Sequence, residues 1–393
     1  MIASHPQRES AELTVLDLFS GCGGLSLGFK WAGFTPVLGV EFERNAAATY
    51  AANFGAVHFG DIAALKEPEF EVPRVDVIVG GPPCQGFSGL GRRDPDDLRN
   101  KLWEEYLRIL RLVRPKVFVI ENVPEFFKSP EYKKLVAALE GDDLKEYGAP
   151  REVVLDAADF GVPQRRKRAF VIGSLTGTPL APQPRRTADA NPAPGLQGWA
   201  TVDEAFAKAS IPLRPSSTEL PDRMQMFEGK LLPGPFQGLE IHVGRNYRPM
   251  SIERYRRIAP GEGRFVLPDE LLFPCWIKKR TGTTDVLGRL EGTKPSVTIR
   301  TEFFKPEKGR YLHPHWMGRE SDASENRAIT HLEAAVLQTF PTDFQWIGSK
   351  VEIARQIGNA VPPLLAYEIA VSSVLPSING VNAADEGPAG GEG

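Results

Sequence analysis

The chain has 393 residues, of which 41% are apolar and 25% charged, and its formal net charge is −3. These values are typical of a soluble globular protein, and the length exceeds that of one compact core, so we expect two domains. No run approaches the ~18 apolar residues of a membrane span, and the N-terminus lacks the apolar segment of a signal peptide. The three scattered cysteines (Cys22, Cys84 and Cys275) exclude a disulfide framework or a zinc cluster and fit a reducing cytoplasm.

The first part of the chain alternates strand and helix patterns. Residues 97–114 have helical periodicity, and residues 151–155 and 169–173 close the series. Apolar runs typical of buried strands occupy residues 14–19, 36–40, 75–79 and 116–120. Repeated strand–helix–strand units with short links predict an α/β fold with a doubly wound, mostly parallel sheet.

The pattern changes near Ser174. From there to about Asn326, prolines and glycines are frequent and arginines alternate with aromatic residues, which predicts an irregular second domain. Helix patterns return at residues 330–337, where we expect His331 on the helix surface, and again after Pro362. The small residues of the C-terminal tail predict disorder.

Two segments are more basic than the rest of the chain. Residues 245–280 contain nine lysines and arginines against four acidic residues, and residues 165–168 are all basic. A charge cluster is more often a solvated face than a binding site. Two such segments in a slightly acidic protein are nevertheless compatible with a confined phosphate-binding surface.

Cys84 lies in a loop that directly follows the expected strand at residues 75–79. Two prolines precede the thiol and glycines lie on both sides of it, so the backbone is stiff and open to a ligand. The carboxyl ends of strands are where α/β folds place their chemistry. A buried structural cysteine is the alternative interpretation, and the loop favours a nucleophile.

Residues 17–28 form a glycine-rich turn after the first expected strand. Such a turn lets a ligand approach bare backbone, next to the free N–H groups of the following helix. Glu41 ends the second strand and suits ribose hydroxyls, and Asp61 could accept a hydrogen bond from an adenine amino group. Either acid alone is more simply explained as a helix cap. Together they predict a pocket for an adenosine-containing cofactor.

With these motifs in order, the chain resembles the DNA (cytosine-5)-methyltransferase family. The resemblance leaves only residues 174–326 without a motif, and there the family keeps its target-recognition domain. The matching segments are residues 17–29, 81–85 (Gly-Pro-Pro-Cys-Gln), 121–123 (Glu-Asn-Val), 161–168, 327–335 and 356–363. The resemblance implies the S-adenosylmethionine-dependent methyltransferase fold with a smaller, irregular target-recognition domain. It also implies a catalytic and cofactor-binding domain at 1–174, target recognition at 175–326, C-terminal helices that return to the catalytic domain at 327–380 and a flexible tail at 381–393.

The resemblance implies a covalent mechanism. Cys84 would add to C6 of cytosine, which makes C5 nucleophilic, and Glu121 would assist at ring N3. Arg166 and Arg168 would supply fixed positive charge near the ring. The target base must leave the duplex stack for this reaction.

The resemblance also implies the ligands and their contacts. The cofactor would be S-adenosylmethionine, released as S-adenosylhomocysteine, and the substrate double-stranded DNA. Cofactor contacts are expected at Phe19, Gly21, Cys22, Gly24, Glu41, Phe42, Asp61, Ile62, Leu102, Asn359 and Ala360. DNA contacts are expected at Gln85, Ser88, Arg165, Thr298, Arg300 and Lys305. We expect neither a metal site nor a membrane, and a monomeric enzyme of the bacterial cytoplasm and nucleoid, with a possible partner restriction endonuclease that is not a stable subunit.

Three alternatives stay open. The tRNA-methylating branch of the superfamily carries a Cys-Phe-Thr element that this chain lacks. A non-catalytic DNA-binding relative would not need both Cys84 and Glu121. A nicotinamide-dependent oxidoreductase would leave the Pro-Pro-Cys loop unexplained. Two departures from the family pattern are Asp156, where asparagine is common, and the denser basic run, in which the assignment of Arg166 and Arg168 depends on register.

Overall fold

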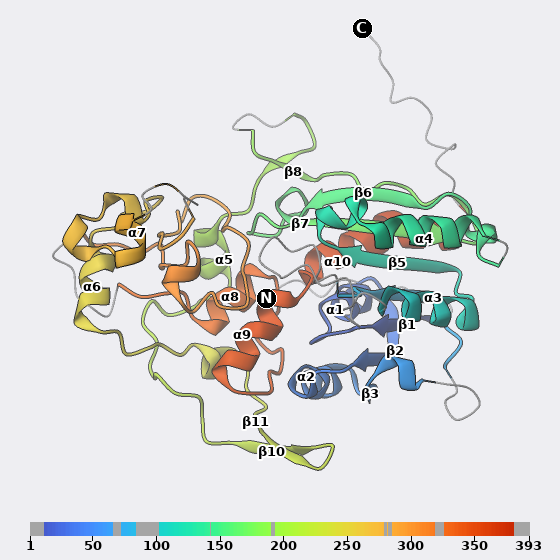
Figure 1. The fold of residues 1–393 in the computed structure, drawn as a ribbon, viewed down its shortest axis with the longest axis horizontal. Helices are drawn as coiled ribbons and strands as arrows, with labels where there is room; N and C mark the ends of the chain where they lie inside the picture. Colours follow the sequence, from blue (N-terminus) through green and yellow to red (C-terminus); the bar gives the residue numbers. More distant parts are fainter. Residues whose placement is uncertain are drawn as a thin grey trace, which may run out of the picture. The chain divides into compact units, whose positions relative to one another are not determined.

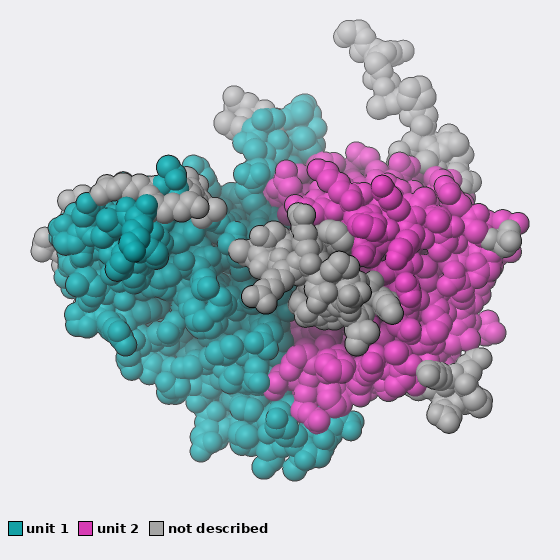
Figure 2. All heavy atoms as spheres, in the orientation of Figure 1, with its two compact units in different colours: residues 1–2, 161–166, 186–360 teal, residues 3–160, 167–185, 361–393 magenta. Residues whose placement is uncertain are grey.

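The computed structural model describes residues 12–65, 72–83, 102–141, 143–189, 193–278, 281, 285–318 and 326–380. The chain forms two compact units (Figure 2). The sheet unit comprises residues 3–160, 167–185 and 361–393, and the second unit comprises residues 1–2, 161–166 and 186–360. The chain therefore crosses between the units several times.

The sheet unit is built on a seven-stranded, mostly parallel sheet in the order β3-β2-β1-β4-β5-β7-β6 (Figure 1). Its strands are β1 (Leu13–Leu18), β2 (Phe34–Glu41), β3 (Val57–Phe59), β4 (Val77–Gly80), β5 (Val117–Asn122), β6 (Arg151–Asp156) and β7 (Lys167–Ser174). The first five strands run parallel, while β7 pairs antiparallel with both β5 and β6. The predicted doubly wound α/β fold is confirmed.

Both faces of this sheet are buried, which explains why its strands read as continuous apolar runs. Alternate residues such as Leu16, Ile78 and Phe118 belong to one apolar cluster with α3 (Leu102–Val113) and α4 (Pro130–Glu140). The residues between them in the strands, such as Val77 and Val119, are equally buried and point to the other face.

Apart from short 3₁₀ turns, the remaining helices of the sheet unit come from its first and last segments. They are α1 (Gly24–Trp31), α2 (Arg44–Phe54), α10 (Pro363–Ile369), the π-helix at Ala370–Val374 and α11 (Leu375–Ile378). Helix α1 packs against α10 so closely that a Cβ atom on Gly28 would lie 2.3 Å from the carbonyl oxygen of Pro363. Residues from Val361 onward therefore pack in the same unit as the first strands and helices of the chain.

The second unit is irregular, as expected, and has only short strands and helices among its described residues. These are β8 (Arg186–Thr187), β9 (Gln197–Gly198), α5 (Val202–Lys208), β10 (Met224–Phe227), β11 (Lys230–Pro233), α6 (Pro249–Arg256), α7 (Pro274–Lys278), α8 (His331–Leu337) and α9 (Lys350–Asn359). Arg289 is fully buried and holds loops together by donating to four backbone carbonyls, those of Tyr255, Ile258, His313 and His315. Burial lowers the pKa of Arg289 to about 9.

Two features differ from the sequence-based expectations. Helices α8 and α9 belong to the second unit, and only the chain from Val361 onward joins the sheet unit. The helical stretch Lys350–Ile378 is long and apolar enough, by length and composition alone, to cross a membrane, although no such stretch was expected. Within the protein 61% of its most apolar window is buried, which is the usual state of a core helix.

Candidate active site

The sheet order brings the predicted catalytic and cofactor loops to one edge. Strands β3, β2, β1, β4 and β5 are parallel neighbours, so the loops after them lie side by side at their carboxyl ends. In this order, these loops or strand ends carry Asp61, Glu41, Phe19 with Gly21, Gly81, and Glu121. The predicted site residues that belong to the sheet unit and are described therefore lie mostly on one rim of its sheet.

The loop between β1 and α1 is shaped for close approach. Phe19 and Gly21 adopt left-handed backbone conformations, with φ of 59° and 55°. A Cβ atom on Gly21 would meet no atom within 4 Å among the described residues, so the space in front of this backbone is open. The loop can accept a ligand directly against its main chain.

Glu41 is tied to this loop. Its Oε2 accepts a hydrogen bond of 2.8 Å from the N–H of Gly21, and its Oε1 accepts one of 2.7 Å from the N–H of Glu43. Burial raises the pKa of Glu41, and these two hydrogen bonds oppose the rise. A carboxylate offers about four lone-pair sites, so Glu41 can also accept from the hydroxyls of a ribose. The ring of the next residue, Phe42, is 75% exposed and is available to stack on a base.

Asp61 and Ile62 begin a short 3₁₀ helix, Ile62–Ala64. Oδ1 of Asp61 accepts from the N–H of Ala63 at 2.9 Å, so this residue is a helix cap as well as a candidate adenine contact. Arg108 of α3 donates to the carbonyl of Ile62 at 2.9 Å and links this loop to the helix that begins at Leu102. The cap orients the loop and leaves Asp61 exposed on the rim.

Asp17 and Cys22 lie beneath the same loop. Cys22 is 2% exposed and burial raises the pKa of its thiol, so it serves as packing for the loop, next to Gly24 at the start of α1. Asp17 is fully buried, and its Oδ2 accepts from the hydroxyl of Ser26 at 2.7 Å. Burial raises the pKa of Asp17 to about 7.

The predicted nucleophile Cys84 and the neighbouring Gln85 and Ser88 lie outside the described residues. The chain that leads to them is well fixed. The side chain of Asn122, at the end of β5, donates from Nδ2 to the carbonyl of Pro82 at 3.0 Å. Sequence reasoning assigned no role to Asn122, although it is part of the Glu-Asn-Val motif.

Glu121 lies beside the same segment. A Cβ atom on Gly81 would lie 2.8 Å from Oε2 of Glu121, so the carboxylate rests against bare backbone three residues before Cys84. The other oxygen, Oε1, pairs with Nε of Arg168 at 2.9 Å, and both side chains are mostly buried. The structure thus brings Glu121 and Arg168 together.

Arg166 lies elsewhere, in the second unit. It is 2% exposed, and its guanidinium donates to the carbonyls of Ile299, Gly358 and Asn359. Side chains in this extended segment alternate, so that Gln164 and Arg166 point inward while Arg165 is exposed. The guanidinium of Arg165 lies 5.2 Å from the ring centre of Trp199.

The other predicted DNA and cofactor contacts in the second unit lie at its surface or close to it. Thr298 donates to the carbonyl of Arg165 at 2.8 Å, Arg300 pairs with Asp285 at 2.9 Å, and Lys305 pairs with Glu302. Asn359 is exposed and Ala360 half-buried, at the end of α9.

One expectation is wrong: His331 is buried, not on a helix surface. It is 4% exposed, donates from Nε2 to the carbonyl of Lys350 at 2.8 Å and stacks on Phe304. Burial lowers the pKa of His331 to about 4. The periodicity of an isolated helix could not reveal this, because the residues that cover His331 come from distant loops.

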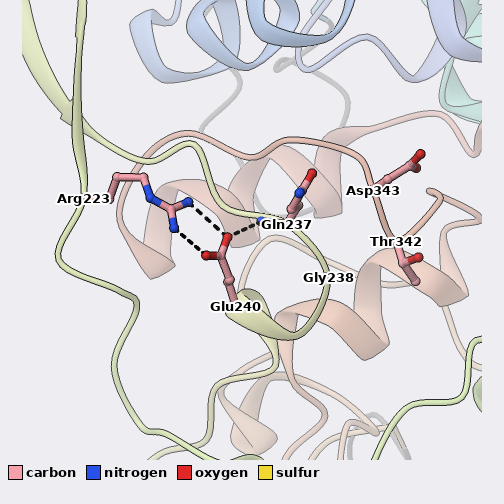
Figure 3. A pocket seen from close by; sticks show the side chains of 6 residues that line it. All are labelled: Arg223, Gln237, Gly238, Glu240, Thr342 and Asp343. Atoms are coloured by element: carbon pink, nitrogen blue, oxygen red, sulfur yellow. Dashed lines mark hydrogen bonds and ion pairs between the residues drawn. The ribbon is translucent and has the colours of Figure 1, made fainter.

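The second unit also contains an open pocket of about 440 Å³ that no predicted site residue lines (Figure 3). Its walls are Arg223, Gln237, Gly238, Glu240, Thr342 and Asp343. Arg223 forms a bidentate ion pair with Glu240, and this hydrogen-bonded pair lowers the pKa of Glu240. Arg223 and Glu240 therefore satisfy each other, which indicates a structural role for this pair.

The chain is similar to known proteins over most of its length. The chain is 34% identical over 368 residues to the type II methyltransferase M1.HphI of Haemophilus parahaemolyticus, which covers 91% of this chain and 86% of that protein. It is 30% identical to M.DdeI of Desulfomicrobium norvegicum, over 94% of this chain and 91% of that protein. Among solved structures, a candidate DNA modification methyltransferase from an E. coli prophage superposes with a TM-score of 0.67 at 25% identity, covering 94% of this chain and all of that one. The family model described as C-5 cytosine-specific DNA methylase matches residues 13–374, and the chain belongs to this family.

Proposed function

We propose that this chain is a sequence-specific DNA methyltransferase that methylates C5 of a cytosine flipped out of a duplex, through a covalent bond between Cys84 and C6. The observation that carries the proposal is the Glu121–Arg168 pair beside Gly81. This pair is a carboxyl group and a fixed positive charge beside the segment that leads to Cys84.

Each of these residues has a step in the reaction. The Cys84 thiolate adds to C6, and the ring electrons that become available make C5 a nucleophile. Glu121 neutralises the charge that develops at N3, and Arg168 holds the Glu121 carboxyl in place and adds positive charge near the ring. After C5 is methylated, loss of its proton lets the Cys84 sulfur leave and restores the aromatic ring.

The methyl donor of this family is S-adenosylmethionine, and the loops on the rim fit it. Bare backbone at Gly21, the anchored carboxylate of Glu41 and the exposed ring of Phe42 are the groups that a nucleoside with a ribose requires. We assign the adenine to Asp61 and Ile62, with Phe19, Cys22, Gly24, Leu102, Asn359 and Ala360 completing the pocket. When bound, the cofactor supplies an electrophilic methyl group and leaves as S-adenosylhomocysteine.

We assign DNA recognition to the region that the sequence places at 175–326 and to the Cys84 loop. The proposed contacts are Gln85, Ser88, Arg165, Thr298, Arg300 and Lys305. Because the curated relatives are type II methyltransferases, we place the enzyme in a restriction-modification system of the bacterial cytoplasm, acting on nucleoid DNA as a monomer. A cognate endonuclease would act separately on the same sequence.

The direct test is methyl transfer from labelled S-adenosylmethionine to mixed duplex DNA, with a tRNA pool as a second substrate. We expect label in 5-methylcytosine of DNA only. Cys84→Ala should remove it, whereas Cys275→Ala, at an exposed free cysteine, should leave the rate unchanged. Duplexes with 5-fluorocytosine at the target should trap a covalent adduct, since fluorine cannot leave as a proton does. Label in tRNA alone, or none in any DNA, would refute the proposal.

A further inference from the structure

The carboxyl end of helix α9 is capped by two buried side chains from distant parts of the chain. The last carbonyls of a helix have no partner within it. Here Nε2 of Gln338 donates to the carbonyls of Ile357 and Ala360, at 2.5 and 3.4 Å. Nη2 of Arg166 donates to the carbonyls of Gly358 and Asn359, at 2.9 and 3.4 Å. Four consecutive carbonyls, which include the predicted cofactor contacts Asn359 and Ala360, are therefore held by side chains.

The same side chains hold a second segment. Nη1 of Arg166 donates to the carbonyl of Ile299 at 3.0 Å, and Oε1 of Gln164 accepts from the N–H of Ile299 at 2.7 Å. Nε2 of Gln164 donates to Oε1 of Gln338 at 2.7 Å, which closes the network. Ile299 lies between Thr298 and Arg300, the predicted DNA contacts.

The two segments also touch directly. A Cβ atom on Gly358 would lie 2.4 Å from the backbone nitrogen of Thr301, so only glycine allows this approach. Gln164, Arg166, Gln338 and Ile299 are all at most 2% exposed, and their hydrogen bonds are shielded from water. Any shift of residues 298–301 must therefore move the end of α9 or break buried hydrogen bonds.

From this geometry we propose that Arg166 is a positioning residue that couples recognition of DNA by residues 298–301 to binding of the cofactor by Asn359. The proposal rests on the proposed function, which assigns those two segments to DNA and cofactor. We propose this positioning role in place of the catalytic role that the sequence suggested for Arg166, because Arg168 is the arginine that pairs with Glu121. Arginine suits this role because its two Nη atoms donate in fixed directions to the two segments, whereas the single nitrogen of a lysine cannot occupy both positions.

The test is a thermodynamic cycle on the full-length protein. The affinity for S-adenosylhomocysteine is measured by calorimetry with and without a duplex that the wild-type enzyme methylates. Coupling between sites typically changes affinity about 5- to 150-fold, and the change must be reciprocal. We expect DNA to tighten S-adenosylhomocysteine binding by a factor in that range, and Arg166→Lys to bring the factor to within about twofold of one.

Arg289→Lys is the matched control. Arg289 is also buried and also caps backbone carbonyls, but none of its acceptors lies in residues 298–301 or 357–360. It should lose stability and keep the coupling. Wild-type coupling in a folded Arg166→Lys variant would overturn the proposal, and so would the absence of coupling in the wild-type protein. In either case, methyl transfer by the wild type would still support the proposed function.

A second measurement needs no variant and applies even where Arg166→Lys does not fold. Hydrogen exchange of the Ile299 amide, which Gln164 holds, should slow when S-adenosylhomocysteine binds in the absence of DNA. Unchanged exchange at Ile299 with saturating S-adenosylhomocysteine contradicts the coupling. Failure to bind S-adenosylhomocysteine at all would instead contradict the proposed function.

Discussion

Glu121 and Arg168 form a mostly buried ion pair of 2.9 Å between neighbouring antiparallel strands, β5 and β7. The pair occupies one carboxylate oxygen of Glu121 and leaves the other against Gly81, in the segment that leads to Cys84. Glu121 is thus held by Arg168 on one side and lies against the segment before Cys84 on the other.

Glu121→Gln keeps the shape of the side chain, but an amide can neither carry the negative charge of a carboxylate nor transfer a proton. We expect the rate of methyl transfer to fall about 100-fold or more, the usual cost of losing a general acid–base group. Binding of S-adenosylhomocysteine should change little, because the cofactor loops follow other strands. Single-turnover kinetics and calorimetry measure the two effects, and a parallel loss of both would contradict the assignment.

Gly81→Ala introduces a methyl group 2.8 Å from Oε2 of Glu121. We expect the carboxylate to be displaced and the turnover rate to fall at least tenfold, since small misplacements of reacting groups are costly. Gly198→Ala is the control, because a Cβ atom there meets nothing within 4 Å. Full activity of Gly81→Ala would show that this contact is not needed.

Phe42→Ala removes an exposed ring next to Glu41. Stacking of a base on an aromatic side chain contributes about 1–3 kcal/mol, so the dissociation constant for S-adenosylhomocysteine should rise roughly tenfold. The melting temperature should not fall, because the ring is 75% exposed. Phe265→Ala, at a ring 53% exposed in the second unit, should leave the affinity unchanged.

Asp17→Asn should make stability less dependent on pH. Burial raises the pKa of Asp17 from 3.8 to about 7, so the folded protein binds this proton more tightly than the unfolded chain does. The wild-type free energy of unfolding should therefore fall as pH rises from about 4 to about 7, by up to about 4 kcal/mol from this group. Denaturation at pH 5 and pH 8 should show that the free energy of unfolding of the variant, relative to that of the wild type, is higher at pH 8 than at pH 5.

His331→Gln should act in the opposite sense. Burial lowers the pKa of His331 from 6.5 to about 4, so the unfolded chain binds this proton first as pH falls. Wild-type stability should decline between about pH 6.5 and pH 4, by up to about 3 kcal/mol from this group. Glutamine keeps a donor for the carbonyl of Lys350 and has no such titration. Equal pH slopes of the two proteins in urea denaturation would argue against a buried neutral His331.

The strands and the loops at their carboxyl ends could be predicted because their signals are local. Apolar runs located β1, β2, β4 and β5, and the residues that end these strands followed directly, as with Glu41 at the end of β2. The separation of Arg166 from Arg168 could not be predicted in this way. Two residues apart in an extended segment, they belong to different compact units, and their partners lie more than 40 residues away in sequence. All five residues at 164–168 are polar, so no local pattern indicated which of them face inward.

The second unit was less predictable for the same reason. Its described helices are short, and its buried polar residues, Arg289 and His331, are satisfied by carbonyls of loops far along the chain. No periodicity in the sequence identifies such partners. The composition predicted that this unit is irregular, but it did not predict the hydrogen bonds from buried side chains that hold its loops together.

The contact between Gly28 and Pro363 has a consequence for biosynthesis. Helix α1, which follows the cofactor loop, emerges from the ribosome long before α10, and at about 5–20 residues per second the interval is tens of seconds. During that time the apolar surface of α1 that α10 will cover is exposed. A nascent chain of this protein therefore cannot complete its sheet unit until α10 has been translated, and truncation before Pro363 leaves an aggregation-prone fragment instead of a smaller working enzyme.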